Sequence, residues 1–215
     1  IKARGRTTIL RLNYRNTDEI LKLATAFARE ILDPREAEED GIPRVAPESA
    51  GRHGPAPVLI KMPNLAREAQ AIGERFTLLK REGGYSWHAM AVVCRTRSVA
   101  DNINCELRRM GIPALPQRAW TQQDEPDGVR VMTMHSSKGL EFPVVAIPGL
   151  GYMPFRNADE AEEARLIYVA MTRSLEHLIL SAHRDSSFVE QLQALMDNRE
   201  HERRTANQRP REAPA

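Results

Sequence analysis

Residues 131–145 read VMTMHSSKGLEFPVV, and they decide the fold because a polar turn stands between two apolar segments. Alternation of side chains predicts a strand from Val129 to Met134, and the apolar run from Val144 to Ile147 predicts a second one. A common phosphate-binding loop runs from Gly to Lys to Ser or Thr, whereas here two serines precede Lys138 and Gly139 follows it. Small donors, one cation and a glycine in succession still suit a polyanionic ligand.

Strand patterns alternate with helix patterns on both sides of this stretch. Further strands are expected over residues 7–12, 58–62, 89–95, 112–115 and 177–182. Helices are expected over residues 16–33, 65–81, 98–111, 159–173 and 188–196, with Asn16/Glu19 and Ser98/Asp101 as capping pairs. This alternation predicts an α/β fold with a mainly parallel, doubly wound sheet and helices on both faces.

The predicted elements form one domain over residues 1–197. Residues 33–57 are rich in acid, Gly and Pro and lack periodicity, which predicts an exposed, mobile loop. Residues 198–215 are rich in arginine and contain two prolines, which predicts a disordered basic tail. The chain begins with Ile1 rather than Met, which favours a segment of a longer protein.

The composition permits some function classes and argues against others. Apolar residues make up 41% of the 215, which is enough for a core. The 31 basic and 29 acidic residues leave a net charge of +2, so nucleic-acid binding depends on how charge is distributed. Cys94 and Cys105 lack metal-ligand spacing, which predicts reduced thiols and no metal site. With no membrane-length apolar run and no secretory signal, a cytoplasmic protein is expected.

Three polar clusters have both a functional and a structural interpretation. Tyr14 and Arg15 offer an aromatic face for a base and a fork for a phosphate, or form an ordinary surface pair before a helix. His135 can contact a polyanion or be a structural histidine, and nearby Glu141 can accept from a sugar hydroxyl. Arg173 can reach a phosphate or complement the end of its helix. All three clusters are expected beyond the carboxyl ends of the strands, where ligands of such sheets bind.

In this order, the clusters resemble motifs of the UvrD/Rep/PcrA-like superfamily 1 DNA helicases. LRLNYRNTDEI (residues 10–20) is similar to motif IV, VMTMHSSKGLEFPVV (131–145) to motif V, and EEARLIYVAMTRS (162–174) to motif VI. Between them, MAVVCRTRSVADNINCELRRMGIP (90–113) resembles a strand and helix of the same family. The resemblance covers about residues 7–182 and implies the second RecA-like motor domain, a three-layer α/β/α fold.

The resemblance assigns one group of residues to ATP, which two motor domains of such helicases hold between them. It implies that Tyr14 stacks on the adenine and that Arg15 and Arg173 contact the γ-phosphate. Arg173 would be the arginine finger. Gly139 and Glu141 would lie near the phosphates and the ribose. The implied cofactor is ATP with Mg²⁺, whose metal ligands are expected on the first motor domain.

A second group is assigned to single-stranded DNA. The resemblance implies that His135 and Thr133 contact the strand where it crosses both motor domains, and that Arg95 and Thr96 contact its backbone. The implied protein partner is the N-terminal RecA-like domain of the same full-length protein, with no membrane partner. The resemblance implies that the full-length protein is an ATP-dependent DNA helicase that acts in DNA repair. It also implies a cytoplasmic protein that associates with the nucleoid.

The sequence also departs from the family pattern. It has no G-x-x-x-x-G-K-[ST] motif and no Asp-Glu pair placed to serve as a magnesium and base site, so this chain alone is not expected to hydrolyse ATP. Many relatives carry an accessory domain, 2B, where only residues 116–128 stand here. Asn16 stands where Ser is more usual and keeps the capacity to cap a helix. The alternative function is a non-catalytic nucleic-acid-binding or scaffolding module descended from such a motor.

Overall fold

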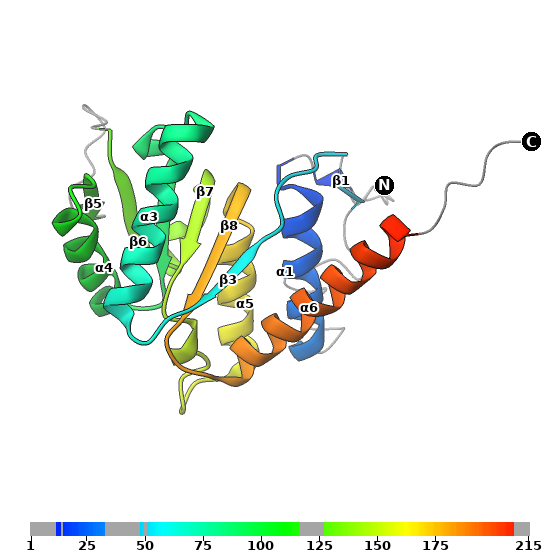
Figure 1. Cartoon of the computed structure of the whole chain (residues 1–215). Helices are drawn as coiled ribbons and strands as arrows, with labels where there is room; N and C mark the ends of the chain where they lie inside the picture. Colours follow the sequence, from blue (N-terminus) through cyan, green and yellow to red (C-terminus); the bar gives the residue numbers. More distant parts are fainter. Residues whose placement is uncertain (1–11, 14, 33–47, 50, 117–126, 209–215) are drawn as a thin grey trace, which may run out of the picture.

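A six-stranded, all-parallel sheet forms the centre of the domain (Figure 1). The computed structural model describes residues 12–13, 15–32, 48–49, 51–116 and 127–208. The strand order is β3-β8-β7-β4-β6-β5. These strands are β3 (Val58–Lys61), β4 (Met90–Cys94), β5 (Ala114–Pro116), β6 (Val129–Thr133), β7 (Phe142–Ile147) and β8 (Ser174–Ala182). The predicted mainly parallel sheet is confirmed.

Helices cover both faces of this sheet (Figure 1). Those described are α1 (Asp18–Ile31), α3 (Leu65–Gly83), α4 (Arg97–Arg109), α5 (Glu160–Met171) and α6 (Ser187–Gln208), with 3-10 helices η1 (Trp87–Ala89), η3 (His135–Ser137) and η4 (Leu150–Tyr152) in the connections. Helices α1, α5 and α6 pack into one apolar cluster, and α3 and α4 pack into another. The expected three-layer α/β/α fold is therefore confirmed.

Strand residues alternate between these two clusters. In β4, Ala91 and Val93 face the helices α1, α5 and α6, whereas Met90, Val92 and Cys94 face α3 and α4. All five side chains are fully buried. Burial on both faces is typical of a central strand in a parallel sheet, and it explains why the sequence of β4 is continuously apolar.

The two predicted capping pairs are wrong. Helix α1 begins after Thr17, whose side chain makes no capping hydrogen bond, while Asn16 and Glu19 make contacts outside the helix. Helix α4 begins after Thr96, whose hydroxyl accepts a hydrogen bond from the N–H of Val99, two residues before the predicted cap. Buried carbonyls compete with the helix end for the side chain of Asn16, and this competition depends on tertiary structure.

Regular structure extends into two segments that were predicted to be irregular. Within residues 33–57, β2 (Glu48–Ser49) pairs in parallel with β1 (Leu12–Asn13). Helix α6 continues to Gln208, into the segment predicted to be disordered from Asn198, and Arg199 on it donates to the carbonyl of Glu19 at 3.0 Å. Residues 7–11, 33–47, 117–126 and 209–215 lie outside the described residues.

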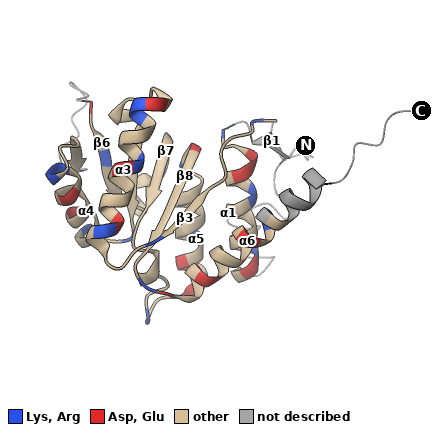
Figure 2. Cartoon of the chain, in the orientation of Figure 1, with Lys and Arg blue, Asp and Glu red and all other residues tan. Residues whose placement is uncertain are grey.

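Basic and acidic residues are mixed along the described helices (Figure 2). Few of them lie on the strands drawn in the same view. The candidate site is therefore identified from particular contacts.

Candidate functional site

Two arginines and a glutamate from three separate segments meet at one edge of the sheet. Arg15 precedes α1, and its Nη1 donates to Oε1 of Glu141 at 2.8 Å. Nη1 of Arg173 donates to the carbonyl of Leu140 at 3.4 Å. The N–H of Phe142 donates to the Arg173 carbonyl at 3.0 Å, which joins the beginnings of β7 and β8. The structure thus brings together three side chains that the sequence predicted to act on a nucleotide.

The last turn of α5 sets the direction of Arg173. Nε of Arg173 donates to the Val169 carbonyl at 3.0 Å, and Nη2 donates to Oγ1 of Thr172 at 3.4 Å. Burial lowers the pKa of Arg173. The charge of Glu141 opposes this shift, and the charge of Arg15 adds to it. An arginine nevertheless stays protonated at neutral pH. The site therefore holds a half-buried positive charge that would favour an anionic ligand.

Asn16 fastens the Arg15 segment to the same junction. Its side chain is buried, and Nδ2 donates to the carbonyls of Thr172 at 3.0 Å and Ser174 at 2.6 Å. These two carbonyls flank Arg173 in the chain. The side-chain amide of Asn16 therefore fixes the backbone on both sides of Arg173, and Asn16 itself directly follows Arg15.

Arg52 is a further site residue that no sequence pattern marked. Its Nη1 donates to the carbonyl of Arg15 at 3.1 Å, and its Nη2 donates to Oε1 of Glu176 at 2.9 Å. The hydroxyl of Tyr85 donates to the other oxygen of that carboxylate at 2.6 Å. Burial and Glu176 raise the pKa of Tyr85 to about 12, so the hydroxyl keeps its proton at neutral pH. Arg52 thus ties the backbone of Arg15 to the start of β8, although its segment lacks periodicity.

Gly139 gives the turn between η3 and β7 its shape. Its φ is +83°, a left-handed conformation that other residues adopt at a cost. A Cβ placed there would meet no atom within 4 Å. The glycine is therefore required by backbone conformation rather than by crowding, and the space beside it is open to a ligand.

The residues predicted to contact nucleic acid lie where β4 and β6 end. These strands are neighbours, with Cys94 level with Thr133. His135 is exposed at the start of η3. Oγ1 of Thr133 forms a hydrogen bond with Oγ of Ser136 at 2.9 Å. The structure therefore places the predicted DNA residues of both strands along one edge.

Arg95 and Thr96 follow β4 at this edge, and both have structural partners. Nε of Arg95 donates to the two carboxylate oxygens of Glu163 at 2.9 and 3.1 Å, and Nη2 donates to Oε1 at 2.6 Å. The guanidinium carbon lies 4.9 Å from the centroid of the Phe155 ring. The hydroxyl of Thr96 accepts from the N–H of Val99 at 3.3 Å. Neither side chain is a loosely held surface group, and their contact with DNA stays a prediction.

The structure corrects the expectation that all three clusters share the carboxyl edge. Thr133 is level with the last residue of β4, whereas Val144 is level with its first. Residues 134–141 therefore run back along the length of β4, which puts His135 and Glu141 at opposite edges of the sheet. The cluster around Arg173 lies at the amino edge, where β7 and β8 begin. Sequence proximity is misleading here because β4 lies between β6 and β7.

Glu68 is a buried carboxylate that organises the carboxyl edge, and the sequence offered no signal for it beyond one acidic residue in a helix. It is fully buried on α3 and accepts from the N–H of Gly149 at 2.8 Å, from Oγ of Ser181 and from Nδ1 of His183. The ring of His183 packs against Tyr152, with centroids 4.8 Å apart. Glu68 therefore fixes the segments that leave β7 and β8.

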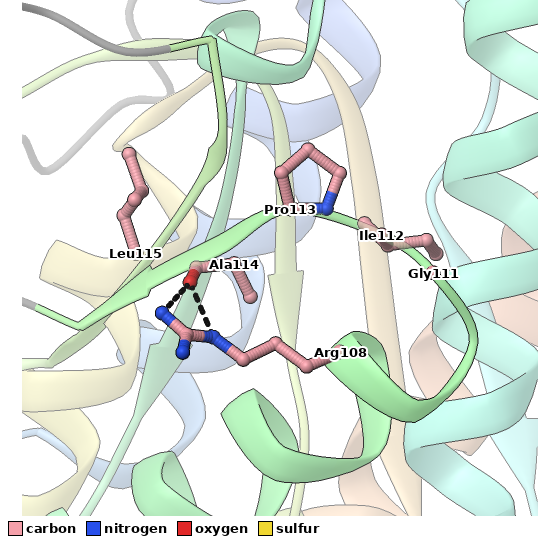
Figure 3. Close-up of a pocket in the computed structure, with 6 residues that line it drawn as sticks. All are labelled: Arg108, Gly111, Ile112, Pro113, Ala114 and Leu115. Carbon is pink, nitrogen blue, oxygen red and sulfur yellow. Dashed lines mark hydrogen bonds between the residues drawn. The ribbon is translucent and has the colours of Figure 1, made fainter.

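A hollow of about 410 Å³ lies beside the edge strand β5 (Figure 3). The residues that line it include neither the predicted nucleotide residues nor the predicted DNA residues. Arg108 and residues 111–115 line it. Arg108 donates through Nε and Nη2 to the carbonyl of Ala114 at 3.0 and 2.8 Å. The guanidinium thus occupies an acceptor of the edge strand, which protects the edge from pairing with another strand.

Three further predictions concern Tyr14, metals and membranes. Tyr14 lies outside the described residues. Over the described ranges, no group of three or more His, Cys, Asp or Glu side chains can hold a metal ion. In the same part of the chain, no helix is both long and apolar enough to cross a membrane.

The all-parallel sheet with helices on both faces defines a RecA-like α/β fold. The chain belongs to the UvrD-like helicase C-terminal domain family, whose model matches residues 8–119 and 114–185. The family assignment confirms the resemblance drawn from the three motifs.

Relatives of this chain include named DNA helicases. It is 50% identical to Bacillus subtilis YjcD over 25% of this chain and 9% of that protein. It is 45% identical to the ATP-dependent DNA helicase Rep of Escherichia coli over 26% of this chain and 9% of Rep. It is 42% identical to the ATP-dependent DNA helicase PcrA of Staphylococcus aureus over 28% of this chain and 10% of PcrA. The matched segments thus span only about a tenth of these relatives.

A solved structure shares the fold. It is the C-terminal domain of a possible DNA helicase from Lactobacillus plantarum, with a TM-score of 0.62 and 19% sequence identity. The match covers 86% of this chain and 96% of that domain. At this identity the likeness concerns the fold alone.

Proposed function

We propose that this chain is the second motor domain of an ATP-dependent DNA helicase or translocase. It would supply one half of an ATP site and part of a track for single-stranded DNA. The observation that carries the proposal is the meeting of Arg15, Glu141 and Arg173 at the amino edge. Two guanidinium groups beside an open turn suit the γ-phosphate of a nucleotide, which two arginines can contact at once.

Each residue at the amino edge has a distinct role in this proposal. Arg173 is the arginine finger and stabilises negative charge on the transferring phosphoryl group. Arg15 contacts the same phosphate. Gly139 lets the backbone approach the nucleotide closely, and Glu141 accepts from a ribose hydroxyl. Tyr14 stacks on the adenine, and the Mg²⁺ that accompanies ATP takes its ligands from the N-terminal RecA-like domain of the full protein.

The carboxyl edge forms the DNA side of the proposal. His135 is exposed there and contacts the strand, with Thr133 beside it. Arg95 and Thr96 approach its backbone from the end of β4. Closure of the two motor domains around ATP changes the grip on DNA, and reopening after hydrolysis restores it. The protein would act in the cytoplasm, on the nucleoid.

The family match supports a domain without the 2B insertion. Its two matched segments, 8–119 and 114–185, overlap at residues 114–119, where β5 leads into residues 116–128. We therefore extend the proposal to a compact motor domain of residues 1–197. Because the sequence contains no phosphate-binding loop of the Walker type, hydrolysis requires the first motor domain.

The test is an Arg173→Ala change in the full-length protein. DNA-stimulated ATP hydrolysis should fall by about 10³-fold or more, while affinity for single-stranded DNA stays close to that of the wild type. Arg109→Ala is the matched control, because Arg109 is an exposed arginine at the end of α4. Retained hydrolysis in Arg173→Ala would refute the role of arginine finger and favour the scaffolding alternative.

A second pair of variants tests the division between the two edges. His135→Ala should weaken binding of single-stranded DNA and its stimulation of hydrolysis. Glu141→Ala should instead raise the KM for ATP while leaving DNA affinity unchanged. The same defect in both variants would contradict the division.

A further inference from the structure

The ion pair between Arg95 and Glu163 joins the carboxyl edge to α5, the helix that leads to Arg173. Glu163 lies in the first turn of α5, and its side chain is 2% exposed. Three N–H···O contacts of 2.6–3.1 Å connect it to Arg95. A buried carboxylate needs such a partner, because an unpaired buried charge is strongly destabilising. The pair therefore fixes where α5 begins relative to the end of β4.

Glu163 occupies only one side of the guanidinium. The contacts use Nε and Nη2 of Arg95, and among the described residues Nη1 makes no hydrogen bond. The side chain of Arg95 remains 20% exposed. A guanidinium has five N–H donors, so Nη1 and the second hydrogen of Nη2 can reach a phosphate while Glu163 holds the other side.

Helix α5 leads from this ion pair to Arg173. Glu163 and Met171, the last residue of α5, are eight positions apart, which is about 12 Å along a helix, and Arg173 follows two residues later. Ile167 and Ala170 on the same helix are fully buried in the apolar cluster. A helix packed in this way moves as a unit, so a shift at its first turn is carried to its last turn.

We infer that Glu163 is a positioning residue that links DNA contact at Arg95 to the placement of Arg173. A DNA phosphate at Nη1 would share the guanidinium with Glu163 and set the position of α5. Arg173 at the other end would then be placed for the phosphoryl group. This inference rests on the proposed function, and it deepens that function by naming how one edge acts on the other.

The experiment uses Glu163→Gln in the full-length protein, with an oligothymidine strand as the DNA. Affinity for the strand should stay the same or rise by up to about threefold, because Arg95 is released from a competing carboxylate. The DNA-stimulated kcat should fall about tenfold with little change in the KM for ATP, because Arg173 is less well placed. A role confined to stability would instead lower affinity, kcat and melting temperature together.

Glu162→Gln is the matched control, because Glu162 is the exposed neighbour on the same helix and the change in charge is identical. It should leave kcat within about twofold of the wild type. The inference is overturned if Glu163→Gln behaves like Glu162→Gln, or if DNA affinity and kcat decline in parallel.

A double variant separates linkage from stability. Arg95→Met with Glu163→Leu replaces the buried pair by apolar side chains, a change that can restore stability. Its melting temperature should recover while stimulated kcat stays low, and recovery of kcat would overturn the inference. Arg173→Ala, measured alongside, addresses the proposed function separately, since hydrolysis in that variant would refute the arginine finger whatever Glu163 does.

Discussion

Replacing Asn16 by alanine should destabilise the domain and impair the amino edge at once. The side chain donates to the buried carbonyls of Thr172 and Ser174 at 3.0 and 2.6 Å. Alanine removes both donors and leaves two acceptors without them. Leaving a buried polar group unsatisfied costs about 1–3 kcal/mol, so the free energy of unfolding should fall by about 2–4 kcal/mol.

Two other substitutions at Asn16 sharpen the expectation. Asn16→Ser introduces a hydroxyl that can donate to only one carbonyl. The loss should therefore be about half that of alanine, about 1–2 kcal/mol. Asn16→Asp keeps the shape but turns an acceptor toward the carbonyls, so its loss at neutral pH should be at least as large as that of alanine. The order of stability should be Asn, Ser, Ala, Asp.

Urea unfolding of the chain followed by circular dichroism measures these free energies. Asn102→Ala is the control, because Asn102 is exposed on α4 and donates only to a carbonyl of its own helix. It should change the free energy of unfolding by no more than about 0.5 kcal/mol. A loss below about 0.5 kcal/mol for Asn16→Ala, or equal stability of the serine and aspartate variants, would refute the reasoning.

Two more predictions concern carboxylates that the sequence left unmarked. Glu68→Gln should lower the free energy of unfolding, measured by urea titration, by about 2–4 kcal/mol. The reason is that a fully buried acceptor of three hydrogen bonds gains a misplaced donor. The exposed control Glu74→Gln should be nearly neutral. Burial alone would raise the pKa of Glu19, yet hydrogen bonds from the Gly54 N–H, its own backbone and His53 lower the pKa below 4.5. A carboxylate whose pKa is lower in the folded than in the unfolded protein stabilises the fold at pH values above its unfolded pKa. That stabilisation is lost as the pH falls through the folded pKa. Stability should therefore decline below about pH 4.5, and Glu19→Gln should show a shallower decline in the same pH series.

The strands and their faces were predictable because each follows a local rule. The run MAVVC in residues 90–94 has the continuous apolar character of a strand buried on both faces, and it is one. The helix predicted over residues 65–81 is α3, and it ends at a left-handed Gly84, a conformation that glycine commonly supplies at helix ends. These signals depend on neighbours within a few residues, so a single sequence contains them.

The partners of individual polar side chains were not predictable. Asn16 looked like a helix cap because a cap is the local use of asparagine, but its carbonyl partners are 156 and 158 residues away. Arg52 and Glu68 gave no local signal at all, since nothing in their own segments identifies Arg15 or Gly149 as a partner. The separation of His135 from Glu141 depends on strand order, which follows from packing of the whole sheet.

The corrected geometry changes how the two edges can act on one another. Two segments run between them, residues 134–141 and helix α5, and both pack into the same apolar cluster through Met134, Ile167 and Ala170. Each begins next to a residue predicted to contact DNA and ends at one predicted to contact the nucleotide. Because interiors are close-packed, a shift of either segment along the sheet would disturb this shared cluster. On the proposed function, the edges therefore need not communicate through one short turn with two ligands, because two packed segments connect them across one face of the sheet.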